Sequence, residues 1–385
     1  MAKGLKAFLV FCIVLVCVAA AVVTAFFAAT FAGVNADVKA QRRRLERLRA
    51  AYESGDYICA DEQKFCDFNL ESALQQNIKL IDLQFLATHN SYKKEKTDLE
   101  KFYAKFSEGL KSGNYSYEPL TDQLNAGIRS LEYDLFYREH KDGVSFHSFH
   151  IGYADMSSNA FDFAACLEEL DLWSRHNPNH LPVTVILELK ERGGAYPYKT
   201  VAKKQLGALD ALLKEKISDL YAPSKALKGY ADLNDMRAVE DSPSLKETMG
   251  KIIFILHRGS LTEDYVNMDE GFKTQAMFPS AYSWRDKAVG KQSFVIINNH
   301  GVDEGSIDEN GGRKNKYLFR VMIDDETNPN PSLNDVLRVV ASDATICSTN
   351  RPPRLNPLNG YECVAFSSDG KTVKLVQDVN CKCAD

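Results

Sequence analysis

Residues 83–92 read LQFLATHNSY, a run of apolar side chains that ends in a Thr-His-Asn-Ser segment. The pattern is typical of a buried strand whose last residues reach a polar environment. His89 can transfer a proton near neutral pH, and the neighbouring Asn90 offers a neutral oxygen ligand. Taken alone, the stretch also fits a hairpin with incidental polar residues. The choice between the two depends on whether later strands end in matching side chains.

Strand-like runs recur at wide spacing along the chain. With residues 83–88 they number eight, the others being 128–137, 144–151, 183–189, 251–257, 293–299, 318–323 and 345–348. Helical patterns lie between several of them, at residues 161–176, 198–217, 245–250 and 332–341. Eight strands alternating with helices predict an α/β fold, a TIM-type (β/α)8 barrel in regular or distorted form. In such barrels the catalytic groups lie at the carboxyl ends of the strands.

Three later strands do carry polar side chains near their ends. The full set is His89, Asn90, Glu132, Asp134, His147, His150, Glu188 and Lys190. Glu132 and Asp134 are two residues apart, so they point to the same face of their strand. Glu188 follows an apolar run, where a charge is costly unless it is satisfied. Three carboxylates and an amide oxygen suit calcium or magnesium, and two histidines beside such a cation can act as general acid and base.

Some of these residues also have plain structural interpretations. Glu132 and Asp134 fit a solvated strand face, although their neighbours are core-like. His147 fits a histidine on the rim of the barrel. Lys190 lies on the same strand face as Glu188, so it either neutralises the carboxylates or contacts a phosphate. Their joint recurrence at strand ends is what favours a functional site.

Residues 7–34 are almost wholly apolar and, as a helix, cover about 42 Å, more than the roughly 30 Å hydrocarbon core of a bilayer. We therefore expect residues 1–36 to be a membrane anchor, with a signal peptide as the alternative. Residues 37–79 are predicted to be a basic stalk and lead-in. No linker or internal repeat divides residues 80–350, which we expect to form the barrel. Residues 351–385 are expected to be a cysteine-containing tail packed on it.

The charge is unevenly distributed. The first 50 residues hold eight Lys or Arg and two Asp or Glu, which leaves 39 and 50 in the rest and a balance of −11. An acidic body excludes nucleic acid as a partner, because nucleic-acid binding needs a basic surface. The basic residues after the apolar segment favour a cytosolic body by the positive-inside rule.

Cysteine usage favours the opposite side of the membrane. Outside the apolar segment and the predicted helix that holds Cys166, six cysteines remain: Cys59, Cys66, Cys347, Cys363, Cys381 and Cys383. An even set of this kind favours a disulfide framework in an oxidising compartment, and six reduced thiols are the alternative. We therefore expect a single-pass protein with an extracytoplasmic catalytic domain, or a secreted one.

The order of these motifs resembles the calcium-dependent phosphatidylinositol-specific phospholipase C superfamily, particularly its single-domain bacterial and fungal-type members. The resemblance rests on FLATHNSY, LTDQLNAGIRSLEYDLF and FHIGYADMSSNAFDFAACLEELDLWSRHNPNHLPVTVILELKE, and it returns weakly at LFRVMIDDE and ICSTNRPP. It implies a calcium site formed by Asn90, Glu132, Asp134 and Glu188. It also implies catalytic roles for His89 and for His150 rather than His147.

The resemblance implies an activity as well. The inositol 2-hydroxyl would attack the neighbouring phosphorus, releasing diacylglycerol and a cyclic inositol phosphate. His150 is expected to act as the acid and His89 to stabilise the transition state, with either Glu132 or His89 as the base. Lys190 and Arg320 are the expected substrate contacts, although Met322 stands where the family often has a second arginine. The expected partners are the phospholipid substrate and the membrane surface; protein partners, oligomeric state and headgroup stay open.

Two rival functions remain. A glycerophosphodiester phosphodiesterase also uses a barrel, a divalent metal and two histidines, and residues 257–259, His-Arg-Gly, are similar to that family's opening motif. The tripeptide stands far along this barrel instead of at the end of its first strand, so we expect no role for it. The other rival is a non-catalytic, membrane-bound lipid-binding barrel, which the intact polar set disfavours.

Overall fold

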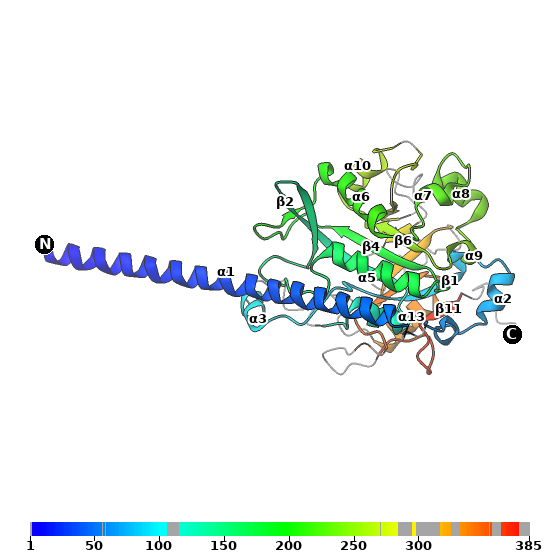
Figure 1. Ribbon diagram of the computed structural model, residues 1–385, viewed down its shortest axis with the longest axis horizontal. Helices are drawn as coiled ribbons and strands as arrows, with labels where there is room; N and C mark the ends of the chain where they lie inside the picture. The colour runs from blue at the N-terminus through cyan, green and yellow to red at the C-terminus, as the bar shows by residue number, and fades with distance from the viewer. Residues whose placement is uncertain are drawn as a thin grey trace.

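The computed structural model describes residues 2–55, 57, 59–105, 115–269, 271–283, 295–297, 316–324, 332–353, 355 and 363–376. A single long helix extends away from an α/β body in which helices surround a curled sheet (Figure 1). The α-helices are α1 (Ala2–Glu53), α2 (Leu70–Gln75), α3 (Asp98–Ala104), α4 (Leu120–Asn125), α5 (Phe163–His176), α6 (Leu206–Lys216), α7 (Pro223–Leu227), α8 (Leu233–Glu240), α9 (Leu245–Thr248), α10 (Thr262–Val266) and α13 (Leu333–Ala341). Short 3-10 turns are η1 (Glu62–Phe65), η2 (Leu80–Asp82) and η4 (Lys203–Gln205).

Eight parallel strands form a closed barrel. They are β1 (Leu83–Thr88), β2 (Ser130–His140), β4 (Val183–Leu189), β6 (Ile252–Leu256), β7 (Met277–Ala281), β8 (Val295–Ile297), β9 (Leu318–Met322) and β10 (Ile346–Thr349). Each pairs in parallel with the next in this order, and β10 pairs with β1. The seam between β1 and β2 is a single pair, Ala87 with Ser130. The predicted TIM-type barrel is confirmed.

Three further strands lie outside the barrel. β3 (Gly143–Ser148) and β5 (Lys199–Thr200) pair antiparallel with the long outer part of β2. β11 (Val373–Leu375) pairs antiparallel with β1, so this part of the C-terminal region packs on the barrel.

Two of the sequence predictions about strands were wrong. The run 144–151 is not a barrel strand, because β3 turns straight back along β2 as a hairpin, and alternation alone does not distinguish a hairpin return from a barrel strand. Strand β7, whose residues read MFPSA, was not predicted. Pro279 lacks an N–H donor and normally argues against a central strand, which hid this element.

The strands direct alternate side chains into the barrel and out toward the helices. One apolar cluster contains Phe85 and Ala87 of β1 together with Ile253 and Ile255 of β6, and it fills the interior. The intervening residues, such as Leu131, pack outward with the helices. Because of the same alternation, some side chains at the carboxyl ends of the strands point into the barrel, at the end that we call the upper interior.

Helix α1 continues from its apolar half onto the surface of the body. Its later residues pack along α5, where Leu45 and Tyr52 are buried. Arg44 pairs with the buried Glu169 at 2.9 Å, and Arg42 and Arg49 pair with acidic residues beside the same helix. The predicted basic stalk is therefore a docked helix, and its arginines serve packing, which weakens them as indicators of membrane topology.

The structure does not support disulfides among the described cysteines. Cys59, Cys66, Cys347 and Cys363 are free thiols, while Cys381 and Cys383 lie outside the described residues. Cys66 and Cys347 are buried in the core, where thiols pack as small apolar side chains. The predicted disulfide framework is therefore not confirmed for these four cysteines, and packing in the core is a sufficient role for Cys66 and Cys347.

Thiol labelling tests this correction. Burial raises the pKa of Cys66 and Cys166 to about 12, so both thiols stay protonated and shielded in the native protein. At pH 8 we expect iodoacetamide to modify Cys59 and Cys363, which are exposed. After denaturation without reductant, peptide mass spectrometry should find Cys66 and Cys166 modified as well. If Cys66 reacts only after reduction, the predicted disulfides are restored.

Candidate active site

Polar side chains gather in the upper interior of the barrel, where the strands end. His89 has the same alternation as Phe85 and Ala87, and Glu132 and Asp134 alternate with the outward-facing Leu131. Asp134 of β2 is paired in register with Glu188 of the neighbouring strand β4. Because alternation and parallel register coincide here, residues distant in sequence converge at one end of the barrel.

The three predicted carboxylates are each in contact with a protein cation or a hydroxyl. Glu132 forms a buried ion pair with Arg320. Lys190 lies between the other two, with Nζ at 3.1 Å from Asp134 Oδ2 and 3.0 Å from Glu188 Oε1. The Tyr92 hydroxyl donates to Asp134 Oδ2 at 2.9 Å. Lys190 and Arg320, predicted as substrate contacts, therefore hold the carboxylates in this structure.

Neighbouring charges, acting against burial, give Asp134 and Glu188 different pKa values. Burial, with repulsion from Glu188, raises the pKa of Asp134 to about 6 in spite of Lys190. For Glu188 burial acts in the same direction, but Lys190 and the nearby histidines outweigh it and lower its pKa to about 2. The paired carboxylates in turn raise the pKa of Lys190 against the effect of burial. Of these two carboxylates, Asp134 is thus the one whose charge is less well compensated.

Asn90 is held in an unusual backbone conformation beside these carboxylates. Its φ is +52°, a left-handed region that asparagine tolerates better than most residues. The Tyr92 hydroxyl lies 3.2 Å from Asn90 Oδ1, and Asn90 Nδ2 donates to the Tyr115 hydroxyl at 3.2 Å. Tyr92 therefore links Asn90 to Asp134, and the tight turn after β1 aims the amide at the site.

His89 lies at the inner end of the same turn. Its Nδ1 is 3.2 Å from Asn350 Oδ1 and 3.2 Å from the Tyr115 hydroxyl. Burial lowers the pKa of His89 to about 4, an effect only partly offset by the negative charge of Glu132. The ring is consequently neutral at physiological pH. Asn350 and Tyr115 are neighbours of the site that sequence reasoning missed. Asn350 follows the predicted strand 345–348 as Asn90 follows 83–88, so its signal was present, whereas Tyr115 lies outside every predicted strand.

His150 belongs to a buried charge cluster. Its Nδ1 is 3.0 Å from Asp155 Oδ2, and the same carboxylate pairs with Lys93 and lies 3.7 Å from Lys96. Burial would raise the pKa of Asp155, but Lys93 and His150 lower it to about 2, so it stays ionised. Asp155 thus orients the imidazole through Nδ1. His147 is separate from this cluster, since it bonds Ser145 and packs against Phe161 and Tyr198.

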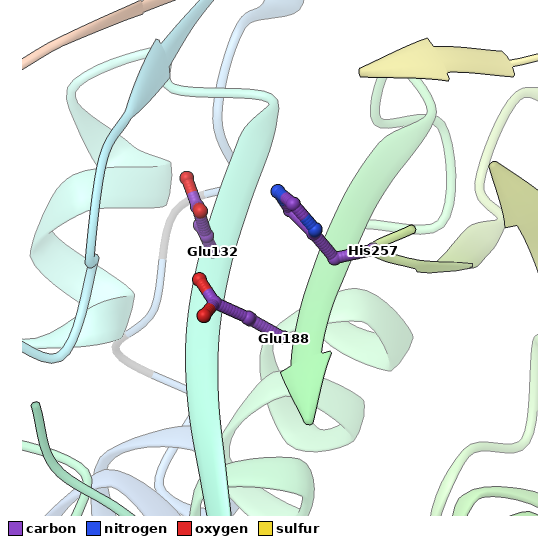
Figure 2. Close-up of side chains that lie close together, drawn as sticks. All are labelled: Glu132, Glu188 and His257. Atoms are coloured by element: carbon purple, nitrogen blue, oxygen red, sulfur yellow. The ribbon is translucent and has the colours of Figure 1, made fainter. Parts of the chain in front are cut away.

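The structure adds His257 to the predicted set. One ligand atom each of Glu132, Glu188 and His257 lies within 4.8 Å of the others, and the three side chains point into the same space (Figure 2). We expected no role for His257 because its tripeptide stands far along the chain. It nevertheless follows β6 with the alternation of Ile253 and Ile255, and that signal was present in the sequence.

The donor set fits a calcium ion. Asp134 Oδ1 is buried and has no hydrogen-bond partner among the residues that the structure describes. Asp134 shares Lys190 with Glu188 and shares the Tyr92 hydroxyl with Asn90. The orphaned carboxylate oxygen therefore belongs to a set of hard oxygen donors of the kind that calcium prefers. The nitrogen of His257 is a less suitable calcium ligand, so the oxygen donors carry the fit.

An open cleft of about 440 Å³ leads to this cluster. Its lining includes Glu188, Lys190, Arg192, His257, Arg258 and Tyr282. The cleft lies at the carboxyl end of the barrel, since these residues follow β4, β6 and β7. Its cations suit a phosphate-containing ligand.

A barrel with oxygen donors that fit a hard cation, two histidines and a cleft lined by both cations and carboxylates is typical of the class of divalent-metal phosphodiesterases. Comparison with protein families identifies the group within that class. The model for calcium-dependent phosphoinositide phospholipase C matches residues 78–148 and 137–373. This match spans most of the chain, which therefore belongs to that family. The predicted superfamily, enzyme class and calcium cofactor are confirmed.

Solved structures agree on the fold. A calcium-dependent phosphatidylinositol-specific phospholipase C from Streptomyces antibioticus is 20% identical, with a TM-score of 0.51 over 71% of this chain and 95% of that one. A calcium-dependent phosphoinositol-specific phospholipase C from Pseudomonas sp., in its apo form, is 15% identical, with a TM-score of 0.53 over 82% and 99%. Comparison with curated protein sequences finds no match.

Proposed function

We propose that this protein cleaves phosphatidylinositol-type lipids to diacylglycerol and a cyclic inositol phosphate, with calcium held by Asn90, Glu132, Asp134 and Glu188. The observation that carries the proposal is the buried Oδ1 of Asp134, which has no hydrogen-bond partner in the described part of the chain and whose carboxylate shares Lys190 with Glu188. When bound, calcium supplies a Lewis acid that activates the inositol 2-hydroxyl and offsets charge on the phosphoryl oxygens.

Two cations of the chain are proposed to contact the substrate phosphate. Lys190 and Arg320 each neutralise a carboxylate in the structure. A divalent cation on the same carboxylates would compete with Lys190 for them, and the ammonium would then be available to the phosphate. Arg320 is wholly buried against Glu132, so it is the more constrained of the two.

His89 is proposed as the general base. The Asn350 side-chain oxygen only accepts hydrogen bonds, so its contact makes Nδ1 of His89 the donor. The other ring nitrogen then carries the lone pair, and the neutral ring is ready to take the proton of the 2-hydroxyl. Glu132, the other candidate, is engaged by Arg320.

His150 is proposed as the general acid. Asp155 accepts a hydrogen bond from Nδ1 and fixes the orientation of the ring, which leaves Nε2 to donate a proton to the departing diacylglycerol oxygen. The two histidines thereby have opposite surroundings. Burial keeps His89 neutral, whereas His150 is held beside the ionised carboxylate of Asp155.

A product assay tests the proposed activity. The full chain in detergent micelles containing phosphatidylinositol should release diacylglycerol in calcium and none in chelator. Phosphorus NMR should show a cyclic inositol phosphate as the first soluble product. Release of glycerol phosphate instead would identify a glycerophosphodiester phosphodiesterase, and no turnover of any phosphodiester would favour a non-catalytic lipid-binding barrel.

We also propose that α1 is a retained single-pass anchor. It is the one helix of the described chain that is long and apolar enough to cross a membrane. Cleavage near Ala32-Gly33, as for a signal peptide, would fall within the segment that docks on the body, because Thr30 and Val34 are buried. The burial of Thr30 and Val34 therefore favours a retained helix over a removed one.

Labelling and mass measurement test the anchor. In membranes, an impermeant maleimide should modify the exposed Cys59 but leave Cys12 and Cys17, which lie in the proposed span. Intact mass should include residues 1–36. A mature N-terminus near residue 33 would establish the signal peptide instead.

A further inference from the structure

The body does not cover the first part of helix α1, over a length close to the thickness of a bilayer's hydrocarbon core. Residues 4–25 are exposed or nearly so, and the first ring contacts with the body occur at Phe26 and Phe27. Twenty-two helical residues span about 33 Å, close to the roughly 30 Å of a hydrocarbon core. The exposed length and the membrane thickness therefore match, and the body begins where the span would end.

The direction in which this segment leaves the body follows from helix packing. Arg42 pairs with Asp162 at the start of α5, whereas Tyr52 stacks on His176 at its end. The two helices are therefore parallel. Because α5 returns the chain to the start of β4, it runs antiparallel to the barrel strands, as helices do in (β/α) barrels. Residues 4–25 thus extend from the end of the barrel that carries the catalytic cleft. Figure 1 shows this part of α1 projecting away from the body.

Contacts near the exit confirm which end this is. Asp37 of α1 pairs with Lys94, which follows β1, and accepts a hydrogen bond at 3.1 Å from the backbone N–H of Ser158, in the loop before α5. Both partners belong to segments on the cleft side of the barrel. Helix α1 is consequently fixed by side-chain contacts to the end of the barrel that carries the cleft.

Aromatic side chains surround the exit of α1. The Phe26 and Tyr103 ring centroids are 5.7 Å apart, and those of Phe27 and Tyr153 are 5.3 Å apart. Large apolar side chains on the same end remain exposed, with Phe102 at 58% and Tyr196 at 82%. Tyrosine and other aromatic residues concentrate where a protein crosses the membrane–water interface. We call Phe26, Phe27, Phe102, Tyr103, Tyr153 and Tyr196 the aromatic collar.

We infer that α1 and the aromatic collar hold the catalytic cleft against the bilayer that contains α1, so that the enzyme cleaves lipids of its own membrane in cis. The partner of this surface is the lipid headgroup layer on the side of the body. The inference rests on the proposed function, because it assigns the source of the lipid substrate. A clamped helix keeps the cleft at the interface, so substrate is supplied by lateral diffusion and not through water.

Three assays with the full chain separate this inference from the proposed function. In the cis assay, phosphatidylinositol is in the same vesicles as the protein, at about one protein per vesicle. In the trans assay, it is in separate vesicles at the same total concentration, and a micelle assay measures catalysis without a bilayer. We expect the cis rate to exceed the trans rate at least tenfold. Equal rates with full micelle activity would overturn the inference alone, whereas inactivity in micelles would overturn the proposed function.

A helical spacer in α1 tests directly how the distance between the cleft and the membrane affects the cis rate. Inserting EAAAKEAAAKA after Ala25 adds three turns and about 16 Å while keeping the rotational phase of α1. We expect the cis rate to fall toward the trans rate, with micelle activity unchanged. The matched control has the same eleven residues after Met1, beyond the span, and should keep the parent's cis rate. A spacer variant that matched this control would contradict the inference.

Point substitutions test the aromatic collar. Phe102→Ser should lower the cis rate several-fold and leave the micelle rate unchanged. Val239→Ser is the matched control, because Val239 is 68% exposed in α8, next to Glu240, which pairs with Lys79 at the opposite end of the barrel. Equal cis rates for the two variants would exclude the collar as a membrane contact.

Discussion

Asp134→Asn is expected to abolish calcium-dependent turnover while leaving the apo fold intact or slightly more stable. Asp134 supplies the oxygen that lacks a partner, so its loss removes both a ligand and a charge from the proposed calcium site. Without the cation the same carboxylate is unfavourable, because burial and Glu188 oppose its ionisation. An amide of equal shape relieves that repulsion.

Thermal unfolding and activity measure these two effects separately. The parent's midpoint should rise on adding calcium, because a ligand that binds only the folded state stabilises it. The variant's midpoint should respond much less, and its turnover should fall by more than about 10³-fold, a loss comparable to removing a principal electrostatic stabiliser. Glu139→Gln is a matched control, since Glu139 lies on the same strand but is exposed and pairs with Lys199. Parent-like calcium binding and turnover in Asp134→Asn would refute the metal site.

His150→Ala is expected to lower turnover by about 10²–10⁴-fold, the contribution of a general acid, while calcium still stabilises the fold. The departing diacylglycerol oxygen needs a proton, and the side chain held by Asp155 is the proposed donor. An inositol phosphate ester with an aryl leaving group does not need that proton. Turnover of this substrate should therefore be restored in large part in His150→Ala, but not in Asp134→Asn.

Two companion variants sharpen this experiment. Asp155→Asn keeps an acceptor for Nδ1 but removes the charge. We therefore expect its turnover to lie between that of the parent and that of His150→Ala, and the substrate with the aryl leaving group should restore it in part. His147→Ala should stay within a few-fold of the parent, because His147 packs on Phe161 and bonds Ser145. A large loss in His147→Ala with normal turnover in His150→Ala would reverse the assignment of the acid.

Most of the barrel was predictable because its strands are apolar and regularly spaced. Seven of the eight barrel strands were identified from the sequence, and β7 was missed because of Pro279. The run 144–151 was mistaken for a barrel strand, since a hairpin return has the same local alternation as a strand. Register and neighbour relations do not leave a local signal, which is why pairing errors of this kind occur.

The sequence by itself determined the chemistry available to this protein. His89, Asn90, Glu132, Asp134, His150 and Glu188 are set by residue type and by their positions at strand ends, where alternation points them inward. The apolar length of α1 was equally readable, because membrane thickness sets a minimum run of residues.

Only the tertiary structure decided how these groups are combined. It brought His257 from a distant segment to the carboxylates and tied Lys190 and Arg320 to them. It also left one oxygen of Asp134 without a hydrogen-bond partner among the described residues. It also turned the basic segment after the membrane span into a helix docked on α5. These relations depend on contacts between residues tens to hundreds of positions apart. Such contacts arise from barrel closure and packing, and no local pattern encodes them.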